Sequence, residues 1–172
     1  MLRPTRLNQP ELTDVERSFD GGSIDAVAFT IFQKPFPMPR PRGFRTKGGL
    51  VRMYSGKGAE RGIFQAEIRR LLDQPADPLF TSDINVTLTF RIRRPNNHFH
   101  ACNRDTNIIR VAQLHARVTG GDLDNLAKYS LDCMNEIVYK DDNQIINLWL
   151  SKKWCEDATS GGSTTVVVFK NN

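Results

Sequence analysis

The clearest periodic pattern in the chain is a strict alternation of apolar and polar residues over 84–93. A period of two residues is typical of a strand with one buried face and one solvated face. Shorter runs rich in β-branched and aromatic residues predict three more strands, at 26–32, 144–153 and 164–169. We expect these four strands to form one sheet.

Two other segments repeat their apolar residues every three or four positions, which predicts amphipathic helices at 58–73 and 123–138. The order along the chain is therefore strand, helix, strand, helix, strand, strand. Such an order is typical of an α/β (α+β) fold in one domain. We expect a small mixed β-sheet with the two main helices packed on one face.

The segments outside these elements are polar or rich in proline. Residues 1–23 show no periodicity, so we predict a flexible N-terminal tail followed by one folded domain over 24–172. Pro35, Pro37, Pro39 and Pro41 favour extended backbone without regular pairing over 34–52. Residues 95–119 are expected to be an irregular loop.

Hydropathy and cysteine usage bear on localisation. No apolar run approaches the roughly 20 residues that a membrane helix needs, and the N-terminus has no apolar segment typical of a secretory signal. Three scattered cysteines are expected to be reduced thiols rather than a disulfide framework. We therefore expect no membrane partner and a cytoplasmic location, either nucleoid-associated or, for a phage-encoded protein, in the host cytoplasm.

The positive charge of the chain is concentrated in one segment. Residues 34–61 contain eight basic residues and one acidic residue, giving +7, whereas the rest of the chain carries −2. A local basic segment is typical of a nucleic-acid-binding surface, although it is also compatible with a solvated loop. The candidate DNA-binding residues are Lys34, Arg40, Arg42, Arg45, Lys47, Arg52, Lys57 and Arg61.

Acidic residues gather around the second predicted helix. Asp122 and Asp124 stand at its start, Lys128 lies one turn further, and Asp141-Asp142 precede the next strand. Taken singly they can be explained by helix capping, a turn, and an i,i+4 ion pair. Brought together, Asp122, Asp124 and Asp142 would offer oxygen ligands suited to Mg²⁺, with Mn²⁺ as a substitute. A metal held by a basic protein suggests hydrolysis of a polyanion.

This pattern resembles the signature of RusA-type Holliday-junction resolvases. The resemblance rests on Asp122-Leu123-Asp124-Asn125-Leu126-Ala127-Lys128, on Asp141-Asp142-Asn143-Gln144-Ile145, and on the proline- and arginine-rich segment 34–42. It covers about residues 25–170, and the downstream aspartate motif is its most specific part. The chain departs from the family at Gly120-Gly121, where many relatives have a basic residue and a proline.

The resemblance implies a homodimeric, Mg²⁺-dependent endonuclease that makes paired symmetric nicks in four-way DNA junctions during recombination, repair or phage DNA processing. The resemblance assigns the catalytic roles to Asp122, Asp124, Lys128 and Asp142. It implies that Asp141 is a further metal ligand. The alternative is a non-catalytic junction- or duplex-binding protein that retains the fold. A protein that only binds DNA would gain affinity by losing acidic residues near the DNA phosphates. This chain keeps all of these acidic residues, which disfavours the non-catalytic alternative.

Two other segments contain residues of a possible zinc site and of a possible phosphate-binding loop. His98, His100 and Cys102 could contact zinc from one extended segment, but no fourth ligand follows at a suitable spacing. Ser55-Gly56-Lys57-Gly58 lacks the residues that a phosphate-binding P-loop requires around its lysine. We therefore expect no nucleotide cofactor.

Overall fold

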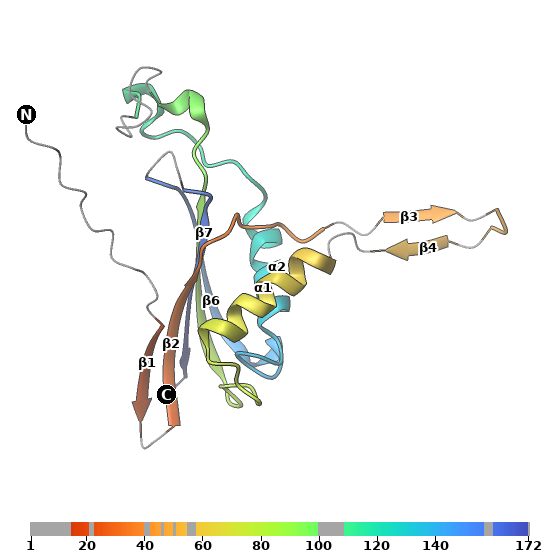
Figure 1. Cartoon of the computed structure of the whole chain (residues 1–172), viewed down its shortest axis with the longest axis vertical. Coiled ribbons are helices and arrows are strands. Elements are labelled where there is room, and N and C mark those ends of the chain that lie inside the picture. The colour runs from red at the N-terminus through yellow and green to blue at the C-terminus, as the bar shows by residue number, and fades with distance from the viewer. Residues whose placement is uncertain are drawn as a thin grey trace, which may run out of the picture.

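A five-stranded mixed sheet with two helices on one face forms the body of the protein (Figure 1). The computed structural model describes residues 15–20, 23–39, 42–45, 47–49, 51–54, 58–99, 109–156 and 160–171, of which 20, 23, 42–45 and 51–54 by their backbone only. Among these residues, no helix is long and apolar enough to cross a membrane.

The sheet has the strand order β1-β2-β7-β5-β6. Its strands are β1 (Glu16–Asp20), β2 (Ser23–Ile31), β5 (Ile84–Ile92), β6 (Ile145–Trp154) and β7 (Ser163–Lys170). Strand β6 runs parallel to β5, and all other neighbours are antiparallel. The predicted mixed sheet is confirmed, with β6 and β1 at its two edges.

The register explains why the sheet has one dry face. Val86 and Leu88 of β5 lie opposite Val168 and Val166 of β7 and are fully buried. Thr87 and Thr89 alternate with them on the other face, where the hydroxyl groups of Thr89 and Ser151 are 2.9 Å apart. The alternation seen in the sequence of 84–93 therefore separates core from solvent as predicted.

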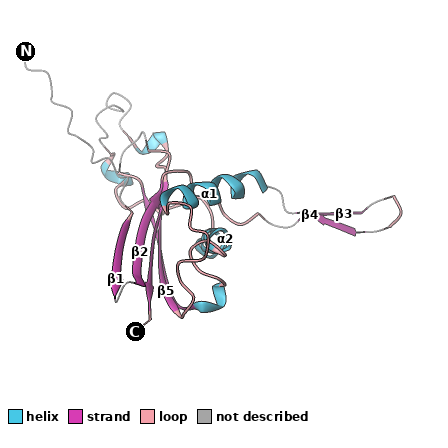
Figure 2. Ribbon diagram, turned by 60° about the horizontal axis from the view of Figure 1, so that its bottom comes forward, coloured by secondary structure: helices cyan, strands magenta, loops and turns pink. Residues whose placement is uncertain are grey.

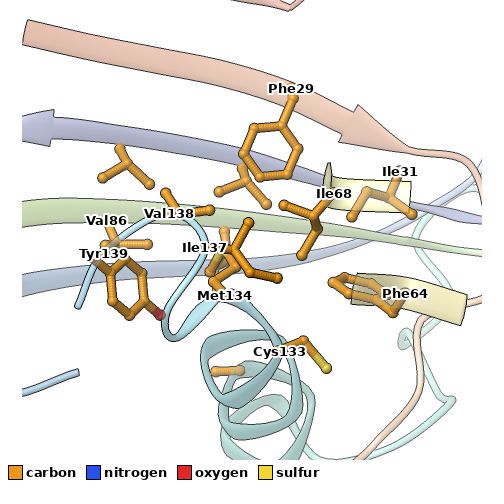
Figure 3. Close-up of a cluster of buried hydrophobic side chains, with 14 of the residues drawn as sticks. Phe29, Ile31, Phe64, Ile68, Val86, Cys133, Met134, Ile137, Val138 and Tyr139 are labelled. Carbon is orange, nitrogen blue, oxygen red and sulfur yellow. The ribbon is translucent and has the colours of Figure 1, made fainter. Parts of the chain in front are cut away.

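The helices α1 (Gly58–Leu71) and α2 (Leu123–Met134) cover the dry face, as Figure 2 also shows. Phe64 and Ile68 from α1 meet Cys133 and Met134 from α2 against Phe29 of the sheet (Figure 3). Full burial of such a side chain stabilises the fold by about 1.5–3 kcal/mol. Helix α1 matches its predicted span almost completely, because its apolar residues face this core.

Helix α2 ends four residues earlier than predicted. The backbone of Asn135 is extended, and Glu136 adopts a left-handed conformation with φ 62°. Glu136 N–H then donates to the carbonyl of Tyr139 at 2.8 Å. Ile137 and Val138 are fully buried in this turn. They are apolar because they pack in the core, and their apolar character led to the prediction of a longer helix.

Two further differences concern the N-terminal third of the chain. Glu16–Asp20 forms edge strand β1, although this segment was predicted to belong to the tail; its only apolar residue is Phe19, so no alternation marked it. Residues 1–14 lie outside the described residues, and the division at residue 23 stays a prediction. In the predicted proline-rich loop, β3 (Arg42–Arg45) and β4 (Val51–Tyr54) pair as a hairpin that extends away from the sheet (Figure 1).

The described residues between β5 and α2 are largely irregular, as predicted for them. They include two short 3-10 helices, η1 (Asn96–His98) and η3 (Val111–Gln113), and Phe99 pairs with Ile109 in an isolated bridge. Residues 100–108 lie outside the described part of the chain, and with them two of the three candidate zinc ligands, His100 and Cys102.

Candidate active site

The start of α2 presents two carboxylates to solvent. Asp122 is the N-cap residue by its extended backbone, with φ −75° and ψ 143°, yet its side chain makes no capping hydrogen bond. Asp124 follows in the first turn, and both residues are exposed. Within the described part of the chain neither carboxylate is engaged in an ion pair. The capping explanation therefore does not account for the Asp122 side chain.

Two glycines set the approach to these carboxylates. Gly120 and Gly121 have φ values of 99° and 108°, a conformation that L side chains rarely adopt. A Cβ on Gly120 would lie 2.8 Å from Cγ2 of Ile92, and one on Gly121 would lie 3.4 Å from Cβ of Pro37. The glycine pair that departs from the family pattern is thus required by the local backbone and by close packing.

Neighbouring segments hold this turn from two sides. The Lys152 ammonium group, at the end of β6, donates a hydrogen bond to the Gly121 carbonyl at 2.7 Å. Met38 N–H, from the proline-rich segment, donates to the Asn125 carbonyl at 2.9 Å. The start of α2 is therefore fixed to the end of the edge strand and to residues 34–39.

Lys128 lies one helical turn beyond Asp124 and is exposed. The i,i+4 ion pair between them is not found among the described residues; the ion pairs found there, Arg17–Asp73 and Arg70–Glu67, involve neither side chain. The ammonium group of Lys128 is therefore not neutralised by the neighbouring carboxylate.

The second acidic motif opens the 3-10 helix η4 (Asp142–Gln144). The Asp141 side chain accepts a hydrogen bond from Asn143 N–H at 2.8 Å, and Gln144 Oε1 accepts from Asp141 N–H at 2.9 Å, forming a capping box. Asp142 is exposed and takes no part in this cap. Asp141 thus has a structural role, whereas the carboxylate of Asp142 is available.

The two acidic motifs lie at opposite ends of β6. Asp142 precedes the strand, whereas Lys152 near its end contacts Gly121. At roughly 3.3 Å per residue, Ile145 and Lys152 are roughly 23 Å apart. Accordingly, no group of three or more metal-binding side chains is found among the described residues. The structure does not bring Asp142 to Asp122 and Asp124 within one chain.

The predicted DNA-binding residues fall into two groups. Lys34, Lys47 and Arg61 are exposed, and Arg61 donates to the Asp132 carbonyl in the last turn of α2 at 2.9 Å. For Arg42, Arg45 and Arg52 the structure gives only the backbone of the β3–β4 hairpin, and Arg40 and Lys57 lie outside the described residues. The hairpin nevertheless places three arginines on one projecting arm.

A cavity of about 680 Å³ lies beside the start of α2. Its lining includes Lys34, Arg93, Arg94 and Trp154, and it reaches Thr119 and Gly120, two residues before Asp122. Arg94 is buried and donates hydrogen bonds to the carbonyls of Gln113 (2.9 Å) and Cys155 (3.4 Å). The described lining residues include no acidic side chain.

Lys152, Arg93 and Arg94 are site residues that the sequence motifs do not include. Lys152 ends a strand whose sequence shows no signal beyond its β-propensity. Arg91, Arg93 and Arg94 cluster at the end of the alternating strand, and this concentration of charge was the available signal.

Burial affects the ionisable groups near the helices. Burial raises the pKa of the Cys133 thiol to about 11, so this thiol stays protonated near neutral pH and is a poor nucleophile. Burial and the neighbouring positive charge of Arg94 lower the pKa of His98. The Cys133 thiol is therefore not a candidate nucleophile.

Comparison with known proteins identifies a family. Residues 33–160 match the family described as Endodeoxyribonuclease RusA, which covers both acidic motifs. The chain is also 25% identical over 135 residues to a Bacillus subtilis (strain 168) protein named "Uncharacterized protein YqaN", covering 78% of this chain and 92% of that protein.

Proposed function

Because the chain belongs to the RusA family of endodeoxyribonucleases, we propose that it resolves four-way DNA junctions by paired symmetric nicks. The observation that carries this proposal is the start of α2, where Asp122, Asp124 and Lys128 are exposed and form no ion pair with any residue that the structure describes. The activity would serve recombination, repair or phage DNA processing, in the cytoplasm.

The donor set suits Mg²⁺, with Mn²⁺ as a substitute, because carboxylate oxygens are the ligands that these hard cations prefer. Asp122, Asp124 and Asp142 would hold the metal, which when bound supplies a Lewis acid for the scissile phosphate. Lys128 stabilises negative charge that develops on the phosphate. Asp141 fixes the backbone that carries Asp142 through its capping box.

A second copy of the chain would complete this acidic set. Strand β6 is an edge of the sheet, so one side of its backbone is free to pair with another strand. If two copies pair β6 antiparallel around Leu148, the start of one strand lies opposite the end of the other. Asp142 of the partner subunit then lies near Lys152 and the start of α2, and the symmetric dimer has two such sites.

The surface of β6 supports this arrangement. Ile146, Leu148 and Trp149 are 46%, 39% and 50% exposed, although they are large apolar residues in the middle of a strand. Trp149 stacks on Phe169 with ring centroids 6.1 Å apart. An apolar edge strand is a site for strand pairing, and a two-fold dimer with two sites matches the near-two-fold symmetry of a four-way junction.

A cleavage assay tests the activity. Purified protein is incubated with labelled four-way junction or linear duplex in Mg²⁺, Mn²⁺ or EDTA. We expect cleavage of the junction with either metal and none in EDTA. Asp124→Asn should abolish cleavage and leave junction binding intact, whereas the exposed Asp77→Asn should change neither. Binding without cleavage under every metal would instead support the non-catalytic alternative.

Mixing two inactive variants tests the shared site. Asp122→Asn and Asp142→Asn each damage every site in their own homodimers. In a mixed dimer with shared sites, one site carries both substitutions and the other carries neither, so nicking of one strand should return. If all the acids of a site came from one chain, each site of the mixed dimer would keep one substitution and no activity would return.

A further inference from the structure

The cavity beside the start of α2 has the properties of a nucleotide subsite. Its volume of about 680 Å³ lies within the range typical of small-molecule pockets, about 300–1,000 Å³. It combines cations, an aromatic ring and polar side chains such as Asn96 and Thr119. We propose that it binds one unpaired nucleotide of the substrate strand, next to the phosphate that is cut. The proposal rests on the proposed function for the identity of the strand.

The charges of the cavity favour a phosphate. Lys34 and Arg93 are exposed, line the cavity, and form no ion pair with any of the described residues. Arg94 is held by two carbonyl groups, which keeps its positive charge fixed at the wall. Because no described lining residue is acidic, an anion entering the cavity meets only attractive charges.

The aromatic wall favours a base. Trp154 lines the cavity, and its indole N–H donates to the Ala116 carbonyl at 2.9 Å, which fixes the orientation of the ring. The Arg94 guanidinium lies 5.7 Å from the centroid of the Trp154 ring, and the His98 ring packs edge-to-face with it at a centroid separation of 5.3 Å. Stacking on such a fixed ring stabilises a bound base irrespective of its identity.

The position of the cavity connects it to the candidate acids. Gly120 lines the cavity and is only two residues from Asp122. Consecutive Cα atoms are about 3.8 Å apart, so the part of the cavity lined by Gly120 lies within about one nucleotide of Asp122. A base that stays paired and stacked inside a duplex cannot stack on a side chain in the wall of this cavity. The subsite therefore selects a strand that is unpaired at the point of cleavage, which is a feature of branched DNA.

Fluorescence of the two tryptophans tests the proposal without any cleavage. Trp149→Phe leaves Trp154 as the only tryptophan, and Trp154→Phe leaves Trp149 as the reciprocal control. Each protein is titrated with a ten-nucleotide oligothymidylate in EDTA. We expect quenching in the protein that retains Trp154 and unchanged emission in the protein that retains Trp149. Equal quenching of both, or quenching of neither, would overturn the subsite.

Affinity measurements in the Trp149→Phe protein give a second test. Removal of a phosphate contact by Arg93→Ala should lower the slope of log K against log salt by about 0.7, the value for single strands. The exposed Arg69→Ala on α1 is the matched charge control and should leave the slope unchanged. An equal effect of both arginines would mean non-specific charge attraction and would overturn the proposal.

The outcomes separate the subsite from the proposed function. If the protein fails to cut junctions but Trp154 is quenched and Arg93→Ala lowers the salt slope, the nucleotide subsite stands and the nuclease assignment falls. If junction cleavage is robust but Trp154 shows no quenching, the nuclease assignment stands and the subsite falls.

Discussion

Replacing Gly120 by alanine should destabilise the protein through two separable effects. A non-glycine residue at φ 99° costs about 1–2 kcal/mol in backbone strain. The new Cβ would lie 2.8 Å from Ile92 Cγ2, and overpacking of this kind costs about 1–3 kcal/mol. Ile92 is buried in β5, so it cannot simply rotate into solvent. We therefore expect the free energy of unfolding to fall by about 2–5 kcal/mol.

Urea denaturation followed by circular dichroism measures this change, and Gly62→Ala is the matched control. Gly62 lies within α1, and a Cβ there would have no neighbour within 4 Å. The same substitution should therefore stabilise the protein by about 0.5–1 kcal/mol, because glycine is unfavourable inside a helix. If Gly120→Ala changed the stability by less than about 0.5 kcal/mol, the size of an ordinary surface effect, the argument from backbone strain and close contact would be refuted.

Three further predictions concern the core, the site and pH. Phe64→Ala should lower the free energy of unfolding by about 3–5 kcal/mol in urea titrations, because the ring is buried between the helices and the sheet. Lys152→Met should lower it by about 1 kcal/mol through the lost hydrogen bond to Gly121, whereas the exposed neighbour Lys153→Met should not. Because the pKa of His98 is lowered in the folded protein, the unfolded chain binds more protons, and the melting temperature should fall as pH drops below about 6.5. His98→Gln should remove this pH dependence and His115→Gln should retain it; equal melting curves at pH 8 and pH 5 for the unmodified protein would contradict the assignment.

Elements with one buried and one solvated face could be predicted from the sequence. Strand β5 alternates because its odd and even positions meet different environments, and α1 repeats its apolar residues because one side packs on the sheet. Strand β1 could not be predicted, since an edge strand is held mainly by its backbone. The early end of α2 was missed because Ile137 and Val138 are buried in a turn and continue the apolar pattern of a helix.

For the site, sequence motifs identified residue types but not their distances. The carboxylates of the two motifs are separated by the length of β6. This separation follows from the parallel pairing of β6 along the whole of β5, which the sequence does not show. The sequence of 122–142 suggests that the two acidic motifs lie close together, because a short helix followed by a turn could bring the chain back to the start of that helix. The cavity was also missed, since it combines residues from segments that are distant in sequence.

The capping box at η4 has a consequence for interpreting inactive variants of this motif. Gln144 accepts hydrogen bonds from the backbone of Lys140 and Asp141, and its amide donates to the Ser82 carbonyl at 2.8 Å. The same five-residue motif therefore contains anchors that attach it to the loop before β5 and one carboxylate, Asp142, that remains free. A random mutagenesis screen for lost cleavage would recover both kinds of residue with the same phenotype. Only thermal stability would distinguish them, because variants of Asp141 or Gln144 should melt earlier and variants of Asp142 should not.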